Sequence, residues 1–159
     1  MIEDGREDRT AMSPTPKTDG FSEAERTAMK ERAAELKSRS RRSKAADRAA
    51  ADENDVLAKI AAMAQPDRAI AERLHAVVTE SAPGLAPKSW YGQPAYARSG
   101  RVVCFFRSGQ ADGERYSTFG FTPHAGLDEE HGMWATSFAL AEWTEQGEET
   151  IRRLLTRAV

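Results

Sequence analysis

The stretch Lys88-Ser89-Trp90-Tyr91-Gly92-Gln93-Pro94-Ala95-Tyr96 opens the part of the chain in which the aromatic residues gather. All three Trp, all three Tyr and five of the six Phe lie between Trp90 and Trp143. Runs rich in aromatic and β-branched residues predict strands, here over 89–97, 101–107, 114–122 and 134–140. Because Ser99-Gly100 suits a hairpin turn and the other connections are too short for helical crossovers, we expect an antiparallel sheet.

Helical patterns flank this predicted sheet on both sides. Ser22 and Glu25 form a capping box that predicts a helix running to about residue 51. Apolar residues then recur at helical spacing on either side of Pro66, and this predicts two short amphipathic helices: Val56, Leu57, Ile60 and Met63, followed by Ile70, Leu74, Val77 and Val78. At the other end of the chain, Thr144 can cap a helix over 145–158. The fold class that follows is α+β.

Three segments differ in composition. Residues 1–20 contain almost no large apolar side chain, so we expect a disordered tail. Residues 21–52 form a charged helical arm, whose apolar positions are nearly all Ala and therefore pack weakly. The basic run within it, 37–44, is interpreted as a solvated helix face rather than as a phosphate-binding surface. Residues 53–159 form the α+β domain.

The composition of the 159-residue chain excludes several classes of protein. The formal net charge is −2, from 23 basic and 25 acidic residues, which disfavours nucleic acid as a partner. No apolar run is long enough to cross a membrane, so we expect no membrane partner. The single cysteine, Cys104, allows no intrachain disulfide. We therefore expect a cytoplasmic protein.

The sequence contains no familiar catalytic motif. It lacks a nucleophile elbow, a phosphate-binding glycine loop, a dinucleotide fingerprint and a zinc motif. Cys104 lies within Val102-Val103-Cys104-Phe105-Phe106, where apolar neighbours predict a buried, un-ionised thiol rather than a nucleophile. We expect no enzymatic activity and no cofactor.

One acidic loop is a candidate metal site. Asp128, Glu129, Glu130 and His131 bring three carboxylates and an imidazole together, and oxygen ligands of this kind hold divalent cations. Asp128, Glu130 and His131 are the predicted metal ligands. The alternative interpretation is an ordinary solvated loop.

The opening stretch is also the candidate ligand site. In a single strand, Trp90, Gly92, Pro94 and Tyr96 would share one face, while Gly92 and Pro94 would kink the strand or place it at an edge. With the phenylalanines that follow, the sheet carries more aromatic surface than a few small helices need to cover. This indicates a pocket or a contact between two copies of the chain, with ordinary core packing as the alternative. The predicted ligand-binding residues are Trp90, Tyr91, Gly92, Pro94, Tyr96 and Phe106.

Residues 55–158 resemble the YdhG-like domains, also called domain of unknown function 1801. The resemblance rests on Ala71-Glu72-Arg73-Leu74-His75, on the stretch 88–96 with its Tyr-Gly-x-Pro core, and on Arg101-Val102-Val103-Cys104-Phe105-Phe106. It implies a curved antiparallel sheet of four to five strands backed by N- and C-terminal helices. Most members of the family have no assigned activity, and some are described as frataxin-like iron chaperones that use acidic surface residues.

Two functions are therefore expected. The first is a non-enzymatic binding domain of the YdhG-like kind, which holds a small molecule or a protein partner on an aromatic sheet face. The alternative is an iron-binding chaperone, in which the 128–131 cluster or the acidic group Asp52, Glu53 and Asp55 supplies the ligands. The basic second half of the N-terminal helix departs from the acidic surface of such chaperones.

Overall fold

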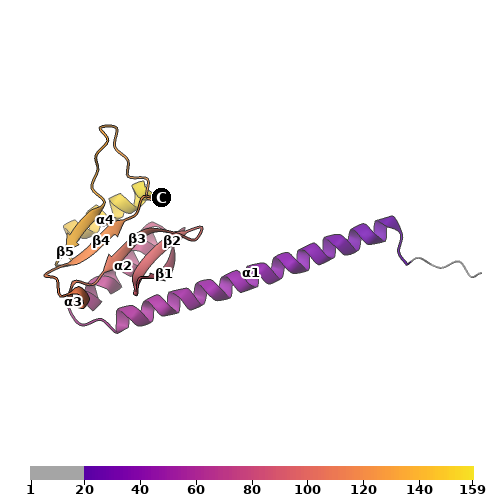
Figure 1. The fold of residues 1–159 in the computed structure, drawn as a ribbon, viewed down its shortest axis with the longest axis horizontal. Helices are drawn as coiled ribbons and strands as arrows, with labels where there is room; N and C mark the ends of the chain where they lie inside the picture. The colour runs from indigo at the N-terminus through magenta and orange to yellow at the C-terminus, as the bar shows by residue number, and fades with distance from the viewer. Residues whose placement is uncertain (1–19) are drawn as a thin grey trace, which may run out of the picture. The chain divides into compact units, whose positions relative to one another are not determined.

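The computed structural model describes residues 20–159, which form four helices and a five-stranded sheet (Figure 1). The elements follow in this order: α1 (Glu23–Ala61), α2 (Asp67–Ser81), β1 (Ala86–Trp90), β2 (Gln93–Arg98), β3 (Arg101–Arg107), α3 (Gly109–Asp112), β4 (Ser117–Phe121), β5 (Ser137–Leu140) and α4 (Glu145–Ala158). Apart from Gly20, the predicted disordered tail lies outside the described residues.

The five strands form one antiparallel sheet, and each strand pairs with the next along the chain in the order β1-β2-β3-β4-β5. This confirms the predicted α+β fold with N- and C-terminal helices flanking the sheet. The last two strands are shorter than predicted. Residues 122–136, which include Pro123, Gly126 and Gly132, form a long connection between them instead.

The single strand predicted over 89–97 is instead a hairpin. β1 ends at Trp90, and β2 begins after two turn residues, Tyr91 and Gly92. Both residues have positive φ, 48° and 75°, as the tightest hairpin turns require. The prediction that Trp90 and Tyr96 share a face is therefore wrong, because the chain reverses between them.

α1 is one continuous helix, although the sequence analysis predicted a break near residue 51. Residues 51–55 contain neither Gly nor Pro, so nothing in them ends the helix. The chain divides into two units after Ser43, whereas the sequence analysis placed the boundary at residue 52. Within the second unit, the buried side chains of Val56 and Ile60 tie the end of α1 into the core. No helix in residues 20–159 combines the length and the apolar composition of a membrane span.

The two faces of the sheet carry separate hydrophobic clusters. The larger one packs the helices against one face, and its largest fully buried members are Tyr96, Phe106, Phe119, Leu74 and Leu155. The smaller one consists of Ala95, Ala97 and Val102, with the partly buried Trp90 and Phe105 packed on them. Within residues 20–159 this second cluster draws on strands alone. We call this second side the open face of the sheet; Figure 1 shows α2 and α4 on the opposite side.

Polar contacts fix the helices to one another. The Glu148 carboxylate on α4 accepts hydrogen bonds from Arg152 at 2.8 Å, from the Trp143 indole at 3.1 Å and from Arg73 of α2 at 2.9 Å. These donors, in that order of effect, lower the pKa of Glu148 to about 2. An ion pair between Arg73 and Glu148 therefore joins α2 and α4 beside their apolar contact.

The predicted helix caps are confirmed. The Ser22 hydroxyl accepts from the Glu25 amide at 3.2 Å, and the Thr144 hydroxyl accepts from the Gly147 amide at 3.0 Å. The one-turn helix α3 was not predicted, because a four-residue helix leaves no periodic pattern in the sequence.

Candidate functional site

Three aromatic rings gather on the open face and at its edge, and we call Trp90, Tyr91 and Phe105 the aromatic cluster. The Trp90 ring lies 5.3 Å from that of Phe105 and 4.9 Å from that of Tyr91, centroid to centroid. Both distances fall in the range of favourable aromatic pairs. Tyr91 is 84% exposed, so the cluster presents ring surface to solvent rather than completing a core.

Gly120 on β4 leaves room for the far end of the Phe105 ring. Phe105 of β3 stands directly opposite Gly120, and a β-carbon at this position would overlap the Phe105 ring. The absence of a side chain here therefore sets the position of Phe105, and with it the contact to Trp90.

A cavity of about 570 Å³ adjoins the aromatic cluster, and we call it the open-face cavity. Its lining combines apolar and aromatic side chains with basic ones: Trp90, Val102, Phe105, Phe121 and Pro123 with Lys88, Arg101 and His124, completed by Gly100 and Thr122. The volume lies within the range of small-molecule sites. An apolar floor with a few polar groups at the rim is also typical of such sites.

The charge at this rim is of one sign. Among residues 20–159, no Asp or Glu lines the cavity. Within residues 20–159, neither Lys88 nor Arg101, nor the adjacent Arg98, has a carboxylate at ion-pair distance. An anionic group on a ligand would therefore meet cations that have no competing partner.

The structure brings together only part of the predicted ligand site. Trp90, Tyr91 and Gly92 lie at the open face and its hairpin turn. Pro94, Tyr96 and Phe106 do not join them, because their side chains are fully buried on the helix-covered side. Those three residues are core positions and do not line the open-face cavity.

The buried groups next to this site are not reactive. Burial raises the pKa of the Cys104 thiol to about 12, which confirms the prediction of a buried, un-ionised cysteine. Burial also raises the pKa of Tyr96, and the neighbouring Cys104 adds to that effect. The Tyr96 hydroxyl lies 3.0 Å from Nδ1 of His75, a polar contact within the helix-covered core.

The predicted metal ligands do not converge. Among residues 20–159, no three His, Cys, Asp or Glu side chains lie close enough together to hold a metal ion. Asp128, Glu130 and His131 are exposed, and the neighbouring Glu129 pairs with Arg157 of α4 at 2.8 Å. Adjacent side chains on an extended loop point in different directions, so closeness in sequence did not produce a site.

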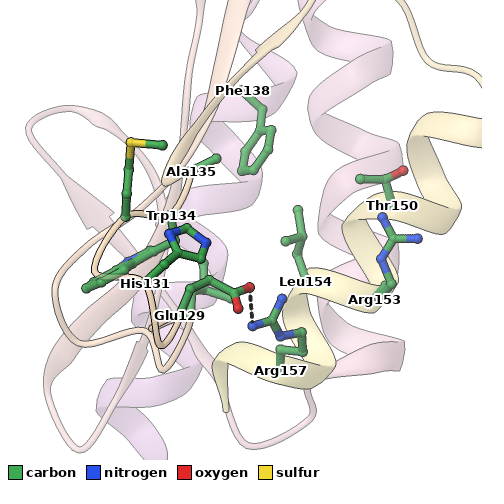
Figure 2. A pocket seen from close by; sticks show the side chains of 11 residues that line it. Glu129, His131, Trp134, Ala135, Phe138, Thr150, Arg153, Leu154 and Arg157 are labelled. Atoms are coloured by element: carbon green, nitrogen blue, oxygen red, sulfur yellow. Dashed lines mark hydrogen bonds and ion pairs between the residues drawn. The ribbon is translucent and has the colours of Figure 1, made fainter.

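His131 instead borders a second cavity, of about 560 Å³, between the 122–136 connection and α4, which we call the α4 cavity. Figure 2 shows Phe138 and Leu154 pointing into the same space, with the Glu129–Arg157 pair at one side. Trp134 and Thr150 also line it. This cavity was not predicted, because its residues lie on a loop and on a helix that are distant in sequence.

The residues that sequence reasoning missed at the open face are Phe105, Lys88 and Arg101. Phe106 was chosen instead of Phe105. Strict alternation could not have corrected this choice, because every second residue from Val102 onward leads to Cys104 and Phe106. A register shift between Tyr96 and Ala97 places Phe105 on the same face as Val102, and this shift leaves no pattern in the sequence. The two basic residues became informative only once the strands were paired.

The arrangement at the open face is suited to binding: it offers ring surface, an apolar floor and unpaired cations, and its apolar neighbours hold no ionised nucleophile. Comparison with family models, curated proteins and solved structures finds no match to the chain.

Proposed function

We propose that this chain is a non-enzymatic, cytoplasmic binding domain of the YdhG-like kind, which holds its partner on the aromatic cluster of the open face. Of the two kinds of partner expected from the sequence, a small molecule fits the open-face cavity better than a protein surface does, because the cavity is concave and of metabolite size. A planar ligand that carries an anionic group matches the rings of Trp90 and Phe105 and the cations at the rim.

The single observation that carries this proposal is the conformation of Tyr91. This residue has φ 48° and a side chain that is 84% exposed. Left-handed backbone is unfavourable for a non-glycine residue, and Asn or Gly would fit the turn better. A large aromatic residue that breaks a local rule without gaining burial indicates a role outside folding.

The test uses the three tryptophans as reporters in separate places. Trp90 lies on the open face, Trp134 lines the α4 cavity, and the Trp143 indole donates a hydrogen bond to Glu148. With ¹⁵N-labelled indoles, we expect members of a panel of planar anionic metabolites to shift the Trp90 signal and the Tyr91 amide, while the Trp143 signal stays in place.

Matched variants sharpen this test. We expect Trp90→Leu to weaken binding about tenfold or more, as loss of a central aromatic anchor does, and Trp134→Leu to leave it unchanged. If the Trp90 signal shifted when the protein was concentrated without ligand, the partner at the open face would be a second copy of the chain rather than a small molecule. If the 90–91 region responded to no ligand and no partner, the proposal would be wrong.

No observation within residues 20–159 favours the iron-chaperone alternative, because no cluster of three suitable ligands forms there.

A further inference from the structure

The α4 cavity combines an apolar body with a basic wall. The apolar part comes from Leu127, Phe138 and Leu154 together with Met133 and Trp134 of the connection. Met133 is 74% exposed and Trp134 38% exposed, which is unusual for side chains of this size. Both line the cavity, so an apolar ligand there would remove their surface from water.

The basic wall belongs to α4. Arg153 and Arg157 stand one turn apart on the helix and both line the cavity. Arg157 pairs with Glu129 at one side of the cavity, whereas Arg153 has no carboxylate at ion-pair distance within residues 20–159. Among these described residues, Glu129 is the single acidic one in the lining. Two arginines and one glutamate leave a net positive charge, and the Arg153 guanidinium can donate hydrogen bonds to an anion.

We propose that the α4 cavity is a second ligand site, separate from the open face, and that it takes a small organic carboxylate with an apolar chain. The chain would lie against Phe138, Leu154 and Trp134, and the carboxylate would accept hydrogen bonds from Arg153. A guanidinium matches a carboxylate in geometry and binds it in two parallel hydrogen bonds. The Glu129–Arg157 pair joins the connection to α4 at the edge of the same space (Figure 2).

Charge and shape together favour a carboxylate over the other small ligands. A neutral apolar molecule would leave Arg153 unpaired beside an apolar surface. A small inorganic anion would use Arg153 but leave Trp134 and Met133 exposed. Only a ligand with both an apolar chain and a carboxylate contacts the whole lining. A neutral apolar molecule and a small inorganic anion are therefore the controls.

The experiment titrates the full chain with octanoate, with octanol and with inorganic phosphate, and follows the indole signals. Octanoate is expected to shift Trp134 and to leave Trp90 and Trp143 in place. Octanol and phosphate are each expected to bind about tenfold more weakly or worse, since each lacks one half of the interaction.

Variants at exposed positions keep the fold intact. We expect Arg153→Gln to weaken octanoate binding about tenfold or more and Arg153→Lys to recover part of it. Arg115→Gln removes the same charge outside the lining and serves as the matched control; it should have no effect. Equal binding of octanol and octanoate, no shift of Trp134, or equal effects of the variants at 153 and 115 would each overturn the proposal. None of these outcomes bears on Trp90, so the open-face function stands or falls separately.

Discussion

At the scale of single residues, two glycines mark places where the backbone or a ring comes too close for a side chain. At Gly120 the neighbour is the far end of the Phe105 ring, which can move. At Gly109 the neighbour is the backbone of Tyr116, which cannot move without displacing β4. The same substitution should therefore have different consequences at the two positions.

Gly120→Ala is expected to lower the free energy of unfolding by about 1–3 kcal/mol, the usual cost of overpacking, and to push the Phe105 ring away from Trp90. Denaturant unfolding gives the first quantity, and a changed Trp90 indole signal reports the second. When Phe105 is already replaced by Leu, adding Gly120→Ala should lower the free energy of unfolding by little more, because the two residues are in contact. Additive losses would show that the ring is not the obstacle.

Gly109→Ala is expected to cost more than Gly120→Ala, because the clash is with backbone rather than with a side chain that can rotate. The comparison is made by chemical denaturation of both variants under one condition. A smaller loss at residue 109 than at residue 120 would contradict the packing described here.

Tyr91→Asn is expected to raise the free energy of unfolding by up to about 1 kcal/mol, since Asn tolerates the left-handed conformation and the lost side chain is mostly in solvent. The same variant should lose affinity at the open face. Tyr91→Phe, which keeps the backbone preference, is the control and should keep the original stability. If Tyr91→Asn were less stable than the original protein, Tyr91 would contribute to folding, and its unusual backbone conformation would no longer indicate a role in binding.

At the scale of elements, the α2–α4 pair depends on a carboxylate that stays ionised in acid. Hydrogen bonds from Arg152, Trp143 and Arg73 hold the pKa of Glu148 at about 2, below its ordinary value of 4.5. A carboxylate with a lowered pKa stabilises the folded state above the unfolded pKa, and this stabilisation is lost as the pH falls through the folded pKa.

Glu148→Gln is therefore expected to be less stable than the original protein at neutral pH, and the difference should shrink as the pH falls from about 4.5 towards 2. Thermal unfolding across this pH range measures it. Glu149→Gln, a substitution of the exposed neighbour, should show no such convergence. A difference that does not change with pH would mean that Glu148 acts through packing alone.

Much of the fold was predictable from local patterns, and the error that most affected the site concerns one turn. β3 and α4 were predicted with the bounds that they have, because Arg101 and Arg107 flank a run of β-branched and aromatic residues and Thr144 caps a periodic helix. The hairpin at Tyr91 was missed because aromatic residues rarely occupy positive-φ positions. The register shift between Tyr96 and Ala97, which was not predicted either, is what places Phe105 rather than Phe106 on the open face.

Most residues that line the two cavities could not be predicted, for a physical reason. The open-face cavity needs the strand register to bring Lys88, Arg101 and Phe105 together. The α4 cavity needs the connection to lie beside the helix. Neither proximity leaves a periodic signal in the sequence, whereas the acidic run 128–131 leaves a conspicuous one that does not build a metal site.

At the scale of the whole molecule, the chain consists of a unit up to Ser43 and a unit from Lys44 onward. In the described part of the first unit, nearly every side chain is exposed. The second unit includes the end of α1, whose Val56 and Ile60 are buried. The folding unit therefore begins inside a helix rather than at a loop.

A shortened chain of residues 44–159 is expected to have a free energy of unfolding within about 0.5 kcal/mol of that of the full chain, because nearly all the described side chains that it lacks, those of residues 20–43, are exposed. A chain of residues 62–159 should lose about 1.5–3 kcal/mol for each of the two buried side chains, Val56 and Ile60. Calorimetry of the three proteins tests this. Equal stability of the two shortened chains would show that the end of α1 adds nothing to the core.

The sheet described above is not closed, so its two outermost strands each keep a row of backbone groups that a neighbouring molecule could join. Long, flat edges of this kind are starting points for fibril growth. Here β1 carries Pro87, which offers no amide hydrogen, and the charged Lys88 beside it. At the other edge β5 is only four residues long. The protein thus has protection against polymerising strand by strand at both margins, even while the ring of Tyr91, next to β1, is exposed.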